Sequence, residues 1–217
     1  MDKIALFEVF INEYDNWFDE HNLLYLSELD AVNHFIPKGK RGLEIGVGTA
    51  RFAALLGIEY GIEPSEKMAG VASSRGIKVI RGVAENLPLK ADSFDFVLFV
   101  TTLCFVRNVS ESINEAKRVL KKNGLLIIGL LDKDSVLGRN YLIKRKGNKM
   151  YQHAVFYSAV EILALLKAMD FLNFSVIQTI FSEQNERQKY IKGYGKGLFV
   201  VIKAVKRKGD RCSQVHT

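Results

Sequence analysis

The sequence is poor in cysteine and proline and has no long apolar segment. Its 217 residues include 2 cysteines and 3 prolines. Cys104 stands in an apolar context and Cys212 in a polar tail, so neither a disulfide framework nor a metal-ligand cluster is expected. No run of about 18 apolar residues occurs, and no basic start leads into an apolar core, which argues against membrane insertion and export. We therefore expect a cytoplasmic protein that holds no metal.

The positive charge is concentrated in two segments. The whole chain has a net charge of +7, of which residues 139–149 contribute +5 and residues 203–211 contribute +4. The rest of the chain is therefore slightly acidic. Aromatic residues do not alternate with the basic ones as they do on surfaces that bind single-stranded nucleic acid. We favour a solvated loop and a solvated tail, and expect no nucleic-acid partner.

Strand-like and helix-like segments alternate along the chain without a linker rich in glycine, proline or serine. A helical region over residues 4–35 ends near Pro37, which cannot continue a helix. Short apolar runs follow at 42–45, 58–62, 77–81 and 94–100. This alternation predicts βαβ units and a mostly parallel sheet in an α/β fold. We expect one domain over residues 1–207 and a polar tail over residues 208–217.

The second half of the chain continues this alternation. Residues 110–121 predict an amphipathic helix with Ser110 as its N-cap. Asn123 or Gly124 can take the positive φ of a turn before a buried strand at 125–131.

A last helix and two strands follow. The helix is expected after its cap, Ser158, and the strands at 173–181 and 197–205. The polar segment between these strands has a length that is typical of functional loops.

The segment RGLEIGVGTARFAALLG, residues 41–57, joins the first apolar run to a helix-like stretch. Gly46 removes a side chain at the turn, and Gly48 lets the main chain approach a ligand. The helix expected to begin near Thr49 aims free N–H groups at negative charge. Ligands of open parallel sheets bind beyond the carboxyl ends of the strands, where this loop lies. The alternative is a tight turn that needs glycine for geometry alone.

Three side chains around this loop indicate the chemistry of its ligand. Glu63 follows the second apolar run, where a carboxylate can accept both ribose hydroxyls of an adenosine, although an ordinary exposed acid is the alternative. A dinucleotide-binding motif would need glycine where the chain has Arg51. Glu44 would repel a pyrophosphate but attract an α-ammonium group. An adenosyl group that carries an amino acid is therefore favoured over a dinucleotide.

These motifs resemble those of the class I S-adenosylmethionine-dependent methyltransferases, in particular the small ubiquinone-biosynthesis-like branch. LEIGVGTARFA is similar to the first motif, with Ala50 where a third glycine is usual. GIEPSEKM is similar to the second motif, and later motifs are RGVAENLPLKADSFDFVLF and EAKRVLKKNGLLIIG. The resemblance implies a Rossmann-like sheet of seven strands in the order 3-2-1-4-5-7-6, with helices on both faces and strand 7 antiparallel.

The resemblance also implies a set of contacts to S-adenosylmethionine. Met68 would pack on the adenine, with Ala84 and Glu85 at its edge. Val83 stands where the family often has aspartate. The cofactor-binding residues expected in full are Glu44, Gly46, Val47, Gly48, Glu63, Pro64, Met68, Ala84, Glu85 and Thr101.

An N-terminal cover is a further implication of the resemblance. Residues 1–38 would form helices over the cofactor site and bring Tyr14, Trp17 and His21 toward the methyl group. Simple packing of aromatic side chains between helices is the alternative.

The end of the fourth strand supplies the remaining candidates. Thr102, Cys104 and Phe105 would join Tyr14 and Trp17 in an acceptor pocket, with Cys104 as a small apolar wall. Transfer of a methyl group from a sulfonium depends on placement and desolvation more than on a base. If a general base or acid is used, the candidates by residue type are His153, His21 and Tyr14.

The sequence thus predicts an enzyme that methylates a small molecule, with S-adenosylmethionine as cofactor and S-adenosylhomocysteine as product. One alternative is an RNA or protein methyltransferase that uses the basic segment 139–149. A second is a nicotinamide-binding dehydrogenase or binding module on a similar scaffold, and a third is a regulatory protein that binds the cofactor without catalysis. The fourth-strand exit, VTTLCFV, lacks the N/D-P-P-Y/F motif of base-methylating branches, which argues against methylation of nucleic-acid bases.

Overall fold

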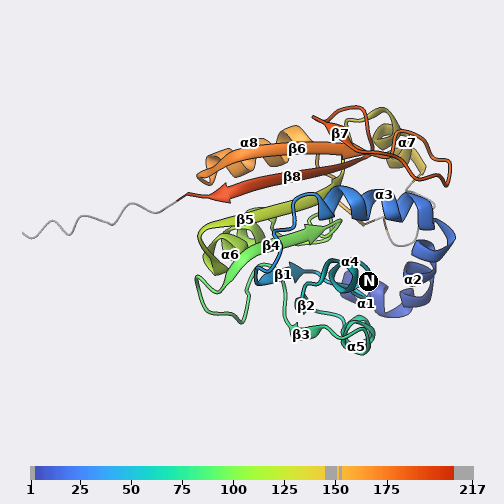
Figure 1. The fold of residues 1–217 in the computed structure, drawn as a ribbon. Helices are drawn as coiled ribbons and strands as arrows, with labels where there is room; N and C mark the ends of the chain where they lie inside the picture. The colour runs from blue at the N-terminus through green and yellow to red at the C-terminus, as the bar shows by residue number, and fades with distance from the viewer. Residues whose placement is uncertain (1–2, 145–150, 152, 208–217) are drawn as a thin grey trace, which may run out of the picture.

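A computed structural model describes residues 3–144, 151 and 153–207 (Figure 1). The strands are β1 (Gly42–Ile45), β2 (Tyr60–Glu63), β3 (Lys78–Arg81), β4 (Phe94–Val100), β5 (Leu120–Leu131), β6 (Phe171–Thr179), β7 (Ile191–Lys192) and β8 (Phe199–Lys206). The helices are α1 (Lys3–Val9), α2 (Ile11–Glu20), α3 (Asn22–Asn33), α4 (Arg51–Leu56), α5 (Glu66–Ser74), α6 (Val109–Val119), α7 (Val136–Lys144) and α8 (Ala159–Ala168). Within these described ranges, no helix combines the length and apolar character needed to cross a bilayer. The tail predicted at 208–217 lies outside the described residues.

The strands form one mixed sheet in the order β3-β2-β1-β4-β5-β8-β6-β7. The first five pair in parallel, whereas β8 is antiparallel to both of its neighbours, β5 and β6. The predicted α/β fold and its strand order are confirmed, because β8 is the predicted strand 7. The structure adds the two-residue edge strand β7, which pairs with β6 inside the segment that the sequence predicts as a loop.

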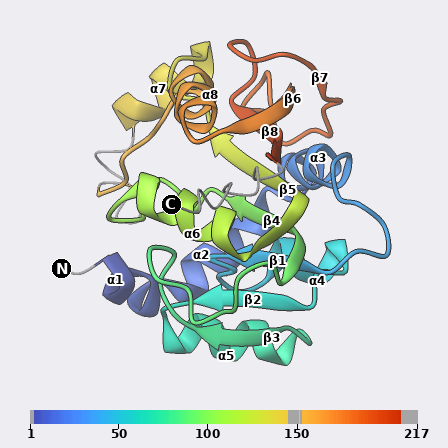
Figure 2. The same cartoon turned by 90° about the vertical axis from the view of Figure 1, so that its left-hand side faces the viewer.

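Helices cover both faces of the sheet (Figures 1 and 2). On one face, α6 and α8 pack in the same apolar cluster as Leu126 and Ile128 of β5. On the other face, α3 and α4 share a cluster with Ile127. Since successive strand residues point to opposite faces, the uninterrupted run LLIIGLL is buried from both sides.

The N-terminal region forms three helices where the sequence predicts a single helical region. The breaks fall at Phe10 and His21, neither of which makes a side-chain cap. Glu8 of α1 accepts a hydrogen bond from the N–H of Glu66 at the start of α5, at 3.0 Å. α3 runs beside β8 (Figures 1 and 2). The region therefore reaches from one end of the sheet to the other.

The helix α6 begins earlier than the sequence predicts. Its N-cap is Asn108, whose Oδ1 accepts the N–H groups of Ser110 at 3.0 Å and Glu111 at 3.2 Å. The prediction of Ser110 as the cap is wrong, because Asn108 is the residue with extended backbone and Ser110 already lies in the first turn.

Two further predictions are wrong. β5 begins at Leu120 and not at residue 125, so the predicted turn lies inside the strand, and α7 occupies residues 139–144 of the segment 139–149 that is expected as a loop. Several other predicted positions are close to those observed. α4 begins at Arg51, two residues after the predicted Thr49. Asn123 has the predicted positive φ, at +61°. Ser158 caps α8 in a capping box with Glu161. Local sequence therefore determines most of the turns that aim the strand ends at the site.

Candidate active site

The loop between β1 and α4 has three residues in the left-handed region. The φ angles are +69° at Gly46, +56° at Gly48 and +66° at Ala50. A Cβ on Gly46 would lie 2.3 Å from Cγ2 of Thr102, and one on Gly48 would lie 3.0 Å from the hydroxyl of Tyr14. The two glycines are thus needed for close approach as well as for φ. Ala50 keeps the conformation that the usual third glycine would have, at a cost of about 1–2 kcal/mol.

Glu63, at the end of β2, is joined to this loop. Its Oε2 accepts the N–H of Gly48 and its Oε1 accepts the N–H of Ser65, each at 2.9 Å. The residue is 5% exposed. The pKa of Glu63 is raised, because the effect of burial is larger than the opposing effects of these two main-chain hydrogen bonds and the charge of Arg81. The loop glycine and the predicted ribose-binding acid therefore lie together.

Glu44 has its side chain on the face of β1 that α4 covers. It is 2% exposed, and its Oε2 has no hydrogen-bond partner among the described residues. Burial raises the pKa of Glu44 to about 8, although a main-chain hydrogen bond from Ala53 lowers it. Glu44 does not line the cavity described next, so the predicted contact with an α-ammonium group stays a prediction.

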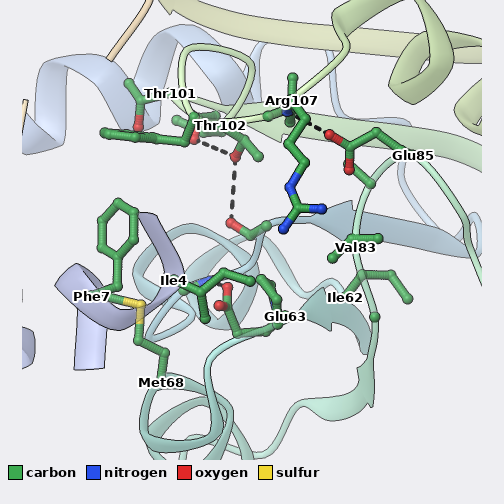
Figure 3. A pocket seen from close by; sticks show the side chains of 18 of the residues that line it. Ile4, Phe7, Ile62, Glu63, Met68, Val83, Glu85, Thr101, Thr102 and Arg107 are labelled. Atoms are coloured by element: carbon green, nitrogen blue, oxygen red, sulfur yellow. Dashed lines mark hydrogen bonds between the residues drawn. The ribbon is translucent and has the colours of Figure 1, made fainter. Parts of the chain in front are cut away.

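A cavity of ≈ 350 Å³ opens above the carboxyl ends of β1, β2 and β4 (Figure 3). Most of the residues predicted for the cofactor and acceptor line it. They are Tyr14, Gly46, Gly48, Glu63, Pro64, Met68, Ala84, Glu85, Thr101, Thr102 and Phe105. Of the predicted set, Glu44, Val47, Trp17 and Cys104 do not line it.

Several lining residues do not follow from the sequence reasoning. Ile4 and Phe7 reach the cavity from α1, and Figure 3 shows Phe7 beside Met68. Arg107 enters from the loop after β4, and Tyr151 from the segment before α8. The spacing of Ile4 and Phe7, three residues apart, is a helical signal for α1, but which helix covers the cavity depends on the tertiary fold.

At the end of the cavity predicted for adenine, the acid Glu85 accepts hydrogen bonds from the main chain. Glu85 accepts the N–H of Arg107 at 2.6 Å and that of Asn108 at 3.3 Å. Val83 lines the same side of the cavity as Glu85 and lies next to Ile62 (Figure 3). This end is therefore an apolar slot with a carboxylate on its rim.

A second cavity, of ≈ 440 Å³, adjoins the first. Both are lined by Tyr14, Thr101 and Tyr151. Trp17 lines this second cavity, and Cys104 lines neither of the two. The two chambers meet at the end of β4, where the methyl group is predicted.

Thr101, on the shared wall, has a strained backbone. Its φ is +48°, although the residue is β-branched, and its N–H donates to the carbonyl of Gly129 at 2.9 Å. Residues of this kind are rare in the left-handed region and cluster at functional sites. The strain turns the chain away from β4 between the two cavities.

The predicted acid and base candidates differ in their placement. Burial, with the charges of Glu44 and Glu63, raises the pKa of Tyr14 well above its ordinary value, so its phenol is a hydrogen-bond donor at neutral pH. His21 stacks on Trp17 at 5.0 Å between ring centroids, and His153 is exposed. Neither histidine lines either cavity.

Asp15 of α2 fastens the N-terminal helices to the glycine loop. Its Oδ2 lies 2.6 Å from Arg51 and 2.7 Å from Arg75, and Thr49 donates to its Oδ1 at 2.6 Å. Burial raises the pKa of Asp15, but the hydrogen bonds from Arg75, Arg51 and Thr49 outweigh it and hold the pKa well below the usual range. Arg51, which stands where a dinucleotide motif has glycine, thus joins the N-terminal helices to the glycine loop.

The polar segment between β6 and β8 holds the corner between α2 and α3. Asn185 accepts the N–H groups of Leu23 and Leu24, and Arg187 forms an ion pair of 2.8 Å with Asp30. The segment predicted as a functional loop therefore supports the helices that wall the second cavity.

Comparisons with known proteins agree with this geometry. A family model described as "Methyltransferase domain" matches residues 43–128. An uncharacterised protein of Methanocaldococcus jannaschii is 48% identical over 203 residues, which are 93% of this chain and 98% of that protein. The demethylmenaquinone methyltransferase of Staphylococcus epidermidis is 30% identical over 122 residues, which are 51% of this chain and 50% of that enzyme.

A crystal structure from Thermotoga maritima is similar over nearly the whole chain. It is described as a SAM-dependent methyltransferase, possible histamine N-methyltransferase. The two sequences are 48% identical, and the structures match with a TM-score of 0.91 over 94% of this chain and 99% of that one.

This chain belongs to the S-adenosylmethionine-dependent methyltransferase family and is an enzyme of that class. Its relatives include the quinone-methylating, ubiquinone- and menaquinone-type branch.

Proposed function

We propose that this chain binds S-adenosylmethionine in the cavity of ≈ 350 Å³ and transfers its methyl group to a small molecule in the adjoining cavity. The observation that carries the proposal is the wall formed by Tyr14, Thr101 and Tyr151, which the two cavities share. One cavity is lined by the motif residues and the other is largely aromatic. A donor and an acceptor could therefore meet with water excluded.

The residues present fit the cofactor. Each carboxylate oxygen of Glu63 accepts one main-chain hydrogen bond and keeps a second lone pair for a ribose hydroxyl. Gly46 and Gly48 leave their main chain uncovered, because a side chain at either position would fill the space beside it.

When bound, S-adenosylmethionine supplies a methyl group on a positively charged sulfur, which leaves readily. The residues of this chain then need only to hold the acceptor and keep water out. Phe7 and Phe105 pack edge to face at 4.8 Å over the first cavity. Tyr14, with its raised pKa, can donate a hydrogen bond but does not accept a proton at neutral pH. Placement by aromatic walls is therefore the main contribution of the protein.

The size of the acceptor is supported by the relatives. The T. maritima protein is described as a possible histamine N-methyltransferase and the S. epidermidis enzyme as a demethylmenaquinone methyltransferase. Both acceptors are small molecules, but they differ in chemistry. They support a small-molecule acceptor and leave its class open.

The test has two parts. Titration calorimetry should show S-adenosylhomocysteine binding, with no comparable binding of NAD. An acceptor-library assay should then release S-adenosylhomocysteine from S-adenosylmethionine with at least one small molecule. Tighter binding of NAD would contradict the cofactor assignment. Methylation of RNA or protein, with none of any small molecule, would contradict the acceptor assignment.

A further inference from the structure

The second cavity contains a carboxyl group that the cofactor site does not use. Glu28 lies in α3 and lines this cavity, although it is only 7% exposed. No described residue donates a hydrogen bond to its side chain, and no ion pair joins it to a described residue. A buried carboxyl group without a partner is rare, because losing its contact with water costs free energy that nothing offsets.

The position of Glu28 in the helix makes this burial more unusual. The neighbours on its face of α3 are Leu24, one turn before, and Ala31 and Val32, one turn after, all buried in the apolar cluster between α3 and the sheet. An apolar residue at position 28 would complete this face. The acid is therefore not explained by the packing of the helix.

The rest of the lining favours a positive charge. Half of the lining side chains are aromatic, among them Phe10, Trp17, Phe52, Tyr141 and Tyr151. The faces of such rings attract cations. Glu13 is a second acid in the lining, and among the described lining residues there is no lysine, arginine or histidine.

We propose that this second cavity is the acceptor pocket for an amine with an apolar or aromatic body, and that Glu28 binds a protonated or N–H-bearing nitrogen of that acceptor. The proposal rests on the proposed function, because it takes the adjoining cavity as the cofactor site. It concerns recognition of the acceptor and holds whether or not the same nitrogen receives the methyl group.

The electrostatics of Glu28 are consistent with this role. Burial alone raises its pKa to about 8, so Glu28 is a largely neutral carboxyl group at pH 7 in the ligand-free protein. A bound ammonium group would stabilise the ionised form of Glu28, so the ion pair would form as Glu28 releases its proton. A neutral alcohol could donate a hydrogen bond to Glu28 but would bring no positive charge to its carboxylate.

The test compares amines with alcohols of the same shape on protein saturated with S-adenosylhomocysteine. Suitable pairs are phenethylamine with phenethyl alcohol and tryptamine with tryptophol, measured by titration calorimetry. Each amine that fits should bind at least about 10-fold more tightly than its alcohol, as expected for a charge-assisted hydrogen bond. This comparison uses the unmodified protein and does not depend on the folding of a variant.

Glu28→Gln then assigns the preference to this residue. The variant should lose about 10-fold or more in amine affinity and keep its affinity for the alcohols and for S-adenosylhomocysteine. The matched control is Glu20→Gln, which changes an exposed acid of α2 that lines neither cavity and should alter amine affinity by less than about 3-fold.

The outcomes separate this inference from the proposed function. Failure to bind S-adenosylhomocysteine would overturn the cofactor assignment. Normal binding of S-adenosylhomocysteine, with alcohols preferred over amines or with no amine bound, would overturn only the role of Glu28. Equal amine affinity in Glu28→Gln would have the same consequence.

Discussion

The carboxylate of Glu63 accepts the N–H of Gly48 at 2.9 Å, across the gap between the loop after β1 and the end of β2. A second main-chain hydrogen bond, from Ser65, fixes the other oxygen. The acid and the glycine are therefore set relative to one another before a ligand enters. Preorganisation of this kind lowers the entropic cost of binding.

Glu63→Gln should weaken binding of S-adenosylhomocysteine by about 10- to 100-fold, because a hydrogen bond to a charged group contributes roughly 1.5–3 kcal/mol. Titration calorimetry measures the change. Glu66→Gln is the control, since this exposed acid three residues later pairs with Arg81 only at 3.9 Å. Equal affinity of Glu63→Gln and the unmodified protein would remove the ribose assignment.

Gly48→Ala should weaken the binding of S-adenosylhomocysteine, because its Cβ would press on the hydroxyl of Tyr14 within the cavity. Gly57→Ala is the matched control. Gly57 has a similar φ, +68°, but a Cβ there would meet nothing within 4 Å. Both variants should lose about 1 kcal/mol of stability in urea unfolding. If both also bind S-adenosylhomocysteine normally, the loop is a plain turn.

Asp15→Asn should lower the free energy of unfolding at pH 7 by roughly 1.5–3 kcal/mol, since two arginines lose a charged partner. Asp19→Asn should cost less than Asp15→Asn, because the side chain of Asp19 is 67% exposed and pairs with Arg51 alone. Urea unfolding of the two variants measures the difference. Because the pKa of Asp15 is lowered in the folded state, its contribution is present above its ordinary pKa of 3.8 and is lost as the pH falls below it. A larger loss in Asp19→Asn would contradict this account of the cover.

Glu28 and Glu44 should make the ligand-free protein less stable as the pH rises. Each has a folded pKa of about 8 against an ordinary value of 4.5. The folded state therefore holds more protons at these two residues between these values, and their contribution to stability is fully present below pH 4.5 and is lost as the pH rises through 8. Glu28→Gln should reduce the difference between urea unfolding at about pH 5 and about pH 9 by up to a few kcal/mol. An unchanged difference would show that Glu28 is ionised in the fold.

The core of the fold could be predicted because its signals are local. The runs at 42–45 and 94–100 coincide with β1 and β4, and the positive φ of Asn123 follows from a residue type that tolerates it, although Asn123 lies within β5 and not in a turn before it. The start of α6 is harder to predict, because both Asn108 and Ser110 are residue types that can cap a helix. Only the structure shows that Asn108 is the one with extended backbone. The edge strand β7 depends on its pairing with β6, for which a two-residue segment has no periodicity to detect.

The site divides in the same way. Gly48 and Glu63 could be paired from their motifs, because the ends of neighbouring parallel strands lie together. His153 was a candidate by residue type alone, and the fold leaves it exposed and outside both cavities. Glu28 was missed, although an acid on the apolar face that Leu24 and Ala31 share is a detectable signal. What it faces depends on the contact of α3 with the sheet.

Tyr14 and Asp15 are neighbours in α2 with different tasks: the phenol stands between the two chambers, and the carboxylate is gripped by Arg51 and Arg75. The side chain that separates the two cavities therefore lies on the same helical turn as the carboxylate that pairs with Arg51 and Arg75, beside the cofactor site. Any displacement of that turn by an occupant of one chamber must alter the shape of the other. Donor and acceptor affinities in this enzyme are therefore expected to be interdependent, and a thermodynamic cycle of the two ligands would reveal the size of that dependence.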